Sequence, residues 1–194
     1  MKLIDNYFEN IDFALKNLDK KNIFNIVKHL KKLRKNKGRL FIIGVGGSAG
    51  NASHAVNDFR KLCGIDAYTP VDNISEITAK TNDEGFQTIF NTYLELCRID
   101  NKDTLLVFSV GGGNIKKNVS VNIVNAIKYA KMKRSKVISI VGRTDGYAYK
   151  NSDYKVFIKI KDKNLVTPIS ESFQALLWHL LVSHPILQIN KTKW

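Results

Sequence analysis

The sequence has few cysteines, no long apolar run and no internal repeat, and each absence excludes a class of protein. Its 194 residues include only two cysteines, Cys63 and Cys97, which are far apart and lack the spacing of metal ligands. We expect both to be free thiols in a reducing cytoplasm. The apolar runs are too short to cross a membrane. The start, MKLIDNYFENIDF, lacks the basic and apolar regions of a signal peptide. With no low-complexity linker, the length predicts one domain over residues 1–194.

Acidic residues are also scarce, since 17 Asp and Glu oppose 31 Lys and Arg and leave a net charge of +14. Such a charge raises the possibility of nucleic-acid binding. The lysines are spread along the whole chain, however, and the densest run, KHLKKLRKNKGR at 28–39, has no interleaved aromatic residues. We interpret this run as the solvated face of a helix followed by a turn. We therefore expect no specific nucleic-acid partner, although the charge would attract an anionic sugar phosphate.

Strand-like and helix-like segments alternate along the chain. Apolar residues at helical spacing predict two helices over residues 2–35, broken near 19–22. Strands are expected at 39–43, 104–109, 136–142 and 154–160, with a short one within 63–73. Helices are expected at 51–62, 75–99 (interrupted at 82–85), 119–133 and from 169 to 184. This alternation is typical of an α/β fold with a mainly parallel sheet.

Two glycine-rich loops follow predicted strands, GVGGSAG at 44–50 and SVGGGN at 109–114. Glycines let backbone N–H groups approach an anion, and a helix start favours negative charge. Neither loop is a Walker A motif, and the first is a poor match to G-x-G-x-x-G. Either loop alone is explained equally well as a tight turn. Both would lie at the carboxyl edge of one sheet, where small ligands bind, so together they predict a phosphorylated ligand rather than a nucleotide cofactor.

Two pairs of polar residues have helical spacing. His54 and Asp58 are four residues apart, which suits two metal ligands, an acid–base pair or a simple surface contact. Glu171 and His179 are eight residues apart and so lie on broadly the same side of the last helix. Alternatively, Glu171 is only a charge partner of the helix dipole, and His179 is a buried core histidine with a hydrogen-bond partner.

Four segments in order, GVGGSAGNASHAVND, TNDEGF, FSVGGGN and ESFQALLWH, resemble the sugar isomerase (SIS) domain family, and within it the phosphoheptose isomerases. The resemblance implies a five-stranded parallel sheet in a three-layer α/β/α fold. It also implies an N-terminal helical segment (1–37) that packs in a homotetramer, an α/β core (38–188) and active sites between subunits. The implied reaction is aldose–ketose isomerisation of sedoheptulose 7-phosphate to D-glycero-D-manno-heptose 7-phosphate through an enediol, in heptose and surface polysaccharide biosynthesis.

The same resemblance assigns the site residues. The positions that match substrate contacts are Val45, Gly46, Gly47, Ser48, Asn82, Asp83, Ser109, Val110, Gly111, Gly112, Gly113 and Asn114. The positions that match ligands of one divalent ion per site, with zinc as the candidate, are His54, Asp58, Glu171 and His179. For catalysis, a carboxylate (Asp58 or Glu171) is the expected base and His179 the expected acid.

Several of these positions depart from the family pattern. Val45 replaces an asparagine, Asp58 a glutamate and Glu171 a glutamine, and Val110, Gly111 and Asn114 stand where phosphate-loop hydroxyls are expected. Backbone amides of the glycine run would still be able to hold a phosphate. The departures leave three interpretations open: an SIS subgroup with the same reaction, an isomerase of another sugar phosphate, and a non-catalytic module that senses a sugar phosphate.

Overall fold

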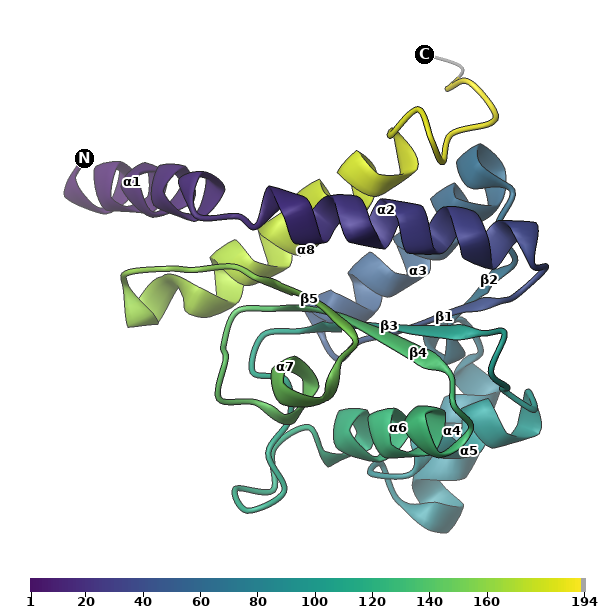
Figure 1. Ribbon diagram of the computed structural model, residues 1–194. Coiled ribbons are helices and arrows are strands. Elements are labelled where there is room, and N and C mark those ends of the chain that lie inside the picture. The colour runs from purple at the N-terminus through teal and green to yellow at the C-terminus, as the bar shows by residue number, and fades with distance from the viewer. Residues whose placement is uncertain (193–194) are drawn as a thin grey trace.

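The computed structural model describes residues 1–192, and its centre is a parallel sheet with helices on both faces (Figure 1). The strands are β1 (Leu40–Ile43), β2 (Ala67–Tyr68), β3 (Thr104–Ser109), β4 (Lys136–Val141) and β5 (Tyr154–Phe157). They pair in the order β2-β1-β3-β4-β5, all parallel. The α/β fold with five parallel strands that the sequence predicts is therefore confirmed.

The helices follow the expected order with a few shifted boundaries. They are α1 (Lys2–Lys16), α2 (Lys20–Lys35), α3 (Gly47–Cys63), α4 (Ile74–Glu84), α5 (Ile89–Leu96), α6 (Val121–Met132), α7 (Tyr147–Asn151) and α8 (Val166–Val182), with short 3-10 turns at Pro70–Asp72 and Lys163–Leu165. Helix α3 begins four residues earlier than expected, because only the first part of the glycine-rich segment is a loop. Helix α7 lies in a segment that the sequence indicated as loop.

The core has two halves, one on each face of the sheet. Alternate residues of β3 face opposite ways, as strand geometry requires. Leu106 and Phe108 pack with α2, α3 and α8, whereas Leu105 and Val107 pack with α5 and α6. All six β3 residues are buried, so the run TLLVFS is apolar without alternation. The three-layer arrangement follows from this double burial.

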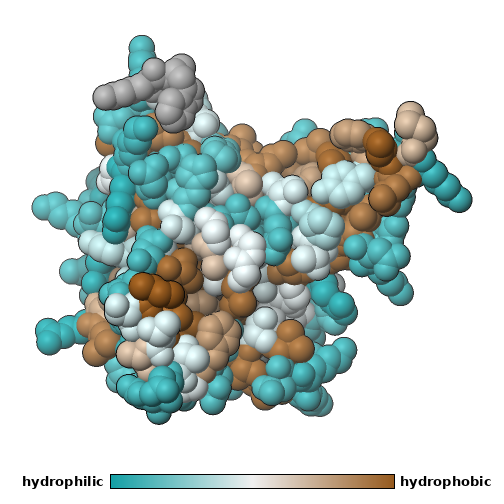
Figure 2. Space-filling model, turned by 180° about the vertical axis from the view of Figure 1, so that it is seen from behind, coloured by the Kyte–Doolittle hydropathy of each residue, from teal (hydrophilic) through white to brown (hydrophobic). Residues whose placement is uncertain are grey.

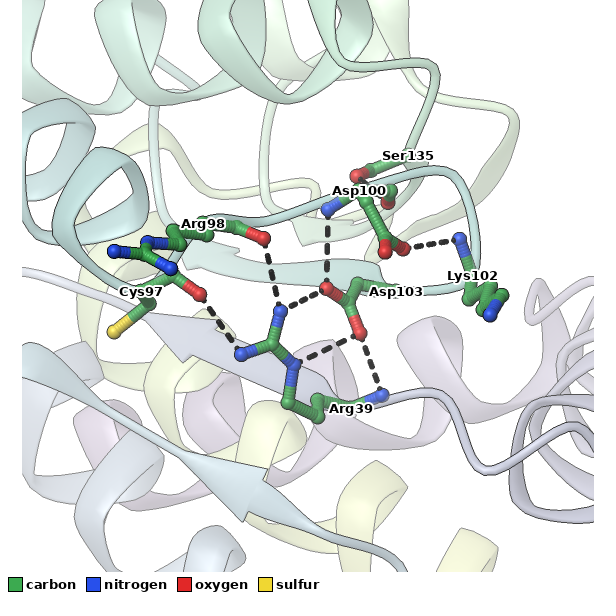
Figure 3. Close-up of polar contacts among 7 residues, drawn as sticks. All are labelled: Arg39, Cys97, Arg98, Asp100, Lys102, Asp103 and Ser135. Carbon is green, nitrogen blue, oxygen red and sulfur yellow. Dashed lines mark hydrogen bonds and ion pairs between the residues drawn. The ribbon is translucent and has the colours of Figure 1, made fainter.

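An ion pair joins β1 and β3 at the edge where both strands begin. The guanidinium of Arg39 donates to both carboxylate oxygens of Asp103, at 3.1 and 2.6 Å, and to the carbonyls of Cys97 and Arg98 (Figure 3). The N–H groups of Arg39 and Asp100 donate to the same carboxylate. These bonds fix the amino-terminal edge of the sheet.

Helix α1 projects from the body of the molecule, with the N-terminus at its far end (Figure 1). Apolar residues run along this arm in Figure 2, and Leu3, Ile4 and Phe8 are each more than half exposed. A surface of this kind on a helix is typical of a contact with another chain. Within residues 1–192, no helix combines the length and the apolar character that a membrane crossing needs.

Candidate functional site

The first glycine-rich loop is a tight turn between β1 and α3. A Cβ on Gly44 would lie 2.3 Å from the backbone oxygen of Ser48, so this position requires glycine. Gly46 has a φ of 63° and accepts a hydrogen bond from the N–H of Ala49 at 2.9 Å. The turn brings the amino terminus of α3 close behind the strand, and it buries Ser48. The predicted substrate-binding Ser48 is therefore a buried residue in the first turn of α3.

The carboxylate of Glu171 lies against this turn. A Cβ on Gly47 would be 2.4 Å from Oε2 of Glu171, so the missing side chain leaves the space that the carboxylate fills. Asn51 strengthens the contact, because its Nδ2 donates to the carbonyl of Glu171 at 2.9 Å and to Oε1 of buried Gln174 at 3.2 Å. The first turn of α3 therefore has a negative charge beside it, as the helix dipole favours.

A second cluster lies further along the same two helices. His54, Asp58 and His179 each offer one possible metal-ligand atom, and these three atoms all lie within 4.8 Å of one another. Nε2 of His54 is 3.9 Å from Oδ2 of Asp58, and the ring centroids of His54 and His179 are 5.5 Å apart. Asp58 is the least exposed of the three, with its other oxygen accepting from Asn57 at 2.9 Å. Three of the four predicted metal positions are thus brought together, and Glu171 lies at Gly47 instead.

The donor set of this cluster fits a divalent metal ion. Nδ1 of His179 lies 2.8 Å from the carbonyl of Ala175, which accepts the ring proton and leaves the lone pair of Nε2 free for a metal ion. Two imidazoles and one carboxylate are a common set for zinc with an open position. Both histidines are exposed, so a substrate can approach the group from solvent.

The cluster and the first loop are held at a fixed separation because α3 and α8 run side by side in the same direction. Asn51 contacts Glu171 near their starts, and Sγ of Cys63 contacts the carbonyl of Val182 near their ends. His54 follows Gly47 by seven residues, which corresponds to about 10 Å along the helix. This distance is on the scale of an open-chain sugar phosphate.

The second glycine-rich loop is held by its own backbone. Oγ of Ser109 accepts from the N–H of Gly112 at 2.9 Å, and Gly112 and Gly113 have φ values of 73° and 79°. The carbonyls of these glycines accept from the first N–H groups of α7, at Ala148 and Tyr147. The serine thus shapes the loop, and the short helix that the sequence did not indicate holds it in place.

Two cations that the sequence analysis missed lie beside this loop. A hollow of about 140 Å³ is lined by Gly111, Gly113 and Asn114 together with Lys117 and Arg143. The guanidinium of Arg143 is paired with Asp145 at 2.9 Å, and this hydrogen bond raises the pKa of Arg143. Arg143 comes two residues after β4 ends, at the same sheet edge as both glycine loops. Its place directly after a predicted strand could have identified it from the sequence as a candidate binding residue.

The remaining predicted substrate positions are spread around this edge. Val45 lines a hollow of about 270 Å³ with Phe86 and Gln87 of the α4–α5 connection. Asn82 and Asp83 are exposed at the end of α4, where Nδ2 of Asn82 donates to Oδ1 of Asp83 at 2.8 Å. Val110 borders a further hollow with Arg143. The structure brings neither Asn82 nor Asp83 into contact with the His54 cluster.

Comparison with known proteins agrees with this arrangement. The model of the SIS domain family matches residues 6–142. Phosphoheptose isomerase of Buchnera aphidicola is 31% identical over 162 residues, which cover 81% of this chain and 77% of that protein. Lincomycin biosynthesis protein LmbN of Streptomyces lincolnensis is 32% identical over 154 residues, which are 76% of this chain but only 56% of that protein.

Among solved structures, phosphoheptose isomerase from Neisseria gonorrhoeae has the same fold. Its TM-score is 0.79 at 21% identity, with 93% of both chains covered. The family model matches most of the chain, and the parallel sheet with glycine loops at its carboxyl edge agrees with that match. The chain belongs to the SIS domain family.

Proposed function

We propose that this chain is a cytoplasmic sugar-phosphate isomerase that converts sedoheptulose 7-phosphate to D-glycero-D-manno-heptose 7-phosphate, for heptose and surface polysaccharide biosynthesis. The observation that carries the proposal is the meeting of His54, Asp58 and His179 within 4.8 Å, about two helical turns from the first glycine loop. The names of relatives such as the Buchnera enzyme support the choice of substrate.

The reaction moves one proton between neighbouring carbons, and the site offers groups for both transfers. A base removes a proton from the carbon beside the carbonyl while an acid protonates the carbonyl oxygen, which gives an enediol. The base then returns its proton to the former carbonyl carbon, and the hydroxyl on the other carbon gives its proton back to the acid and becomes the new carbonyl. Without a metal, His179 is the acid in its imidazolium form, giving up the proton on Nε2 while Nδ1 stays bonded to the carbonyl of Ala175. With a metal, Nε2 of His179 is a ligand and not the acid. Asp58 is the base if the cluster holds no metal, and Glu171 is the base if Asp58 is a ligand.

Zinc is the proposed cofactor, one ion per site, with no nucleotide. His54, Asp58 and His179 would hold it, and the fourth predicted ligand, Glu171, stays beside Gly47. A bound zinc ion supplies a Lewis acid that polarises a sugar carbonyl. The phosphate is proposed to lie at the glycine loops, where Lys117 adds positive charge and Arg143, paired with Asp145 in the same lining, is a further N–H donor.

Proton NMR of the purified chain with sedoheptulose 7-phosphate, with and without added zinc, tests the proposal. We expect the aldose heptose 7-phosphate to appear, faster with zinc. Turnover of a hexose or pentose phosphate in place of the heptose would identify a different substrate, which Val45 in the first loop would explain. Saturable binding of sugar phosphates without turnover would instead support a non-catalytic sensing module.

We also propose that the whole chain is one SIS domain that assembles as a homotetramer with active sites between subunits. The exposed apolar side chains of Leu3, Ile4 and Phe8 on the projecting α1 support this assembly. Light scattering after size exclusion tests it. Phe8→Glu should reduce the assembled mass, whereas Met132→Glu, an equally exposed position at the end of α6, should not. A monomeric wild-type chain would contradict the assembly.

A further inference from the structure

The lysine-rich run at 28–39 does not form a uniformly solvated helix face. One side of α2 lines a hollow of about 700 Å³ at the amino-terminal edge of the sheet. Lys28 and Lys32, one turn apart, form one wall. Lys102 and Lys136, before β3 and at the start of β4, form the other. Four lysines from three segments of the chain therefore surround one space.

The floor of this hollow is neutral and ordered. Nε2 of His29 is 2.9 Å from Oγ1 of Thr104, and its ring lies 4.8 Å from the ring of Tyr154. Burial lowers the pKa of His29, and the positive charges of Lys136 and Lys32 lower it further, against the opposing effect of Asp153. The imidazole thus stays uncharged at neutral pH and offers hydrogen-bonding capacity without adding to the repulsion.

Nearby carboxylates leave most of the positive charge uncompensated. Asp103, the acidic residue in the lining, is buried and bound to Arg39. Asp153 pairs with Lys136 at 2.8 Å. Among the described residues, no ion pair involves the ammonium groups of Lys28, Lys32 or Lys102. The hollow consequently keeps an excess of three positive charges, which repel one another unless an anion lies between them.

The segment that carries Lys102 is fixed before any ligand arrives. The N–H of Lys102 donates to Oδ1 of Asp100 at 2.8 Å, and the neighbouring Asp103 is held by Arg39 (Figure 3). Ser135, next to Lys136, donates to the carbonyl of Asp100. This wall is therefore preorganised, which lowers the entropy lost on binding.

We propose that this hollow binds a small anion carrying two or more phosphate groups. The ammonium groups of Lys32 and Lys102, from two segments that line the hollow, have no carboxylate partner within the described part of the chain. That of Lys28 lies over the ring of Phe24, 5.0 Å from its centroid, and is likewise in no ion pair there. Charges contributed by separate segments match an anion with several phosphate groups better than a single phosphate.

The hollow of about 700 Å³ has the size of a small-molecule site, and the ring of Tyr154 in its lining is packed against His29 rather than free to stack on a base, which favours a small molecule over a nucleic acid. The site is separate from the glycine loops, because β3 places about 16 Å between Thr104 and Ser109.

Isothermal titration of the full chain with inorganic pyrophosphate at low ionic strength tests the site against a matched control. The hollow variant is Lys28→Gln/Lys32→Gln/Lys102→Gln. The control, Lys21→Gln/Lys31→Gln/Lys35→Gln, removes the same charge from exposed positions of the same helix that do not line the hollow. We expect affinity to fall at least about tenfold in the hollow variant and less than about twofold in the control.

The imidazole signals of the four histidines report where pyrophosphate binds. In the wild type, pyrophosphate should shift the imidazole signals of His29 and leave the signals of His54 and His179 in place, and the hollow variant should lose this shift. Equal loss of affinity in both triple variants would show long-range attraction only. No binding, unchanged affinity of the hollow variant, or a shift confined to His54 and His179 would also overturn the proposal. So would equally tight binding of duplex DNA by the wild type and both variants.

Discussion

The carboxylate of Glu171 occupies the space that a side chain on Gly47 would need, so it can lie at the start of α3 in this position only because residue 47 is glycine. The contact brings a negative charge to the amino terminus of α3. It lies beside the bond from Asn51 to the carbonyl of Glu171, which joins α3 to α8 about two turns of α8 before His179 meets His54. One missing side chain thus makes room for a carboxylate at one end of the candidate site.

Gly47→Ala should lower turnover of the sugar phosphate by at least about tenfold with little loss of stability. The added Cβ displaces the end of a flexible side chain, Glu171, rather than backbone. Gly50→Ala is the control, because a Cβ there meets nothing within 4 Å. It should raise the melting temperature by about 1–4 °C, since alanine is the better helix former. Equal turnover in the two variants would show that the position of Glu171 does not matter.

Asp58→Asn and His179→Ala should each reduce turnover by at least about a hundredfold, because each removes an acid–base group or a metal ligand. Zinc content measured after dialysis separates the two roles. Glu171→Gln distinguishes the bases: a loss of about a hundredfold with zinc content retained would make Glu171 the base. Asp66→Asn, an exposed acid outside the cluster, is the control. Full activity in all three site variants would disprove the assignment.

Asp103→Ala should destabilise the chain by about 3 kcal/mol. The buried carboxylate accepts from the side chain and backbone of Arg39 and from Asp100, and its loss leaves these donors without a partner. We expect the melting temperature to fall by about 6–12 °C. Asp12→Ala breaks the exposed pair with Lys16 and should change stability by less than about 1 kcal/mol. Similar effects in the two variants would contradict the structural role of Asp103.

Alkaline pH should destabilise the fold through Cys63. Burial raises the pKa of this thiol from 9.0 to about 11. Between these values the unfolded chain has lost the proton that the folded chain retains, so stability is complete below pH 9 and declines as pH rises towards 11. The decline from this thiol amounts to about 2–3 kcal/mol. Urea unfolding at pH 8 and pH 10.5 measures it, and Cys63→Ala should show a smaller difference between the two pH values. An identical pH dependence in both chains would refute the shift.

The sequence predicted what local spacing determines. The apolar run at 104–109 indicated a strand buried on both faces, and glycines after two strands indicated loops at one edge of the sheet. The four-residue spacing of His54 and Asp58 placed them on one helix face. These features depend only on neighbouring residues, and the structure has them where they were expected.

Contacts between distant segments were beyond that analysis. Without the resemblance to the family, nothing in the sequence shows that α8 lies along α3, which brings His179 to His54 and leaves Glu171 at Gly47. The sequence predicted that α3 begins at residue 51, because GGSAG has the composition of a loop. In the structure the helix already begins at Gly47, where it contacts Glu171. Likewise, Lys102 and Lys136 are far from Lys28 in sequence, so the hollow around His29 exists only in the folded chain.

The indole of Trp178 gives the candidate site an optical signal of its own. Its ring is buried and stacks on His179 with centroids 3.5 Å apart, while His54 meets it edge-on at 4.6 Å. A metal ion bound by imidazoles in contact with an indole changes the emission of that indole. With Trp194, which lies outside the described residues, replaced by phenylalanine, Trp178 is the one remaining tryptophan. The fluorescence of this single residue would then follow metal binding in real time, without a label and without substrate.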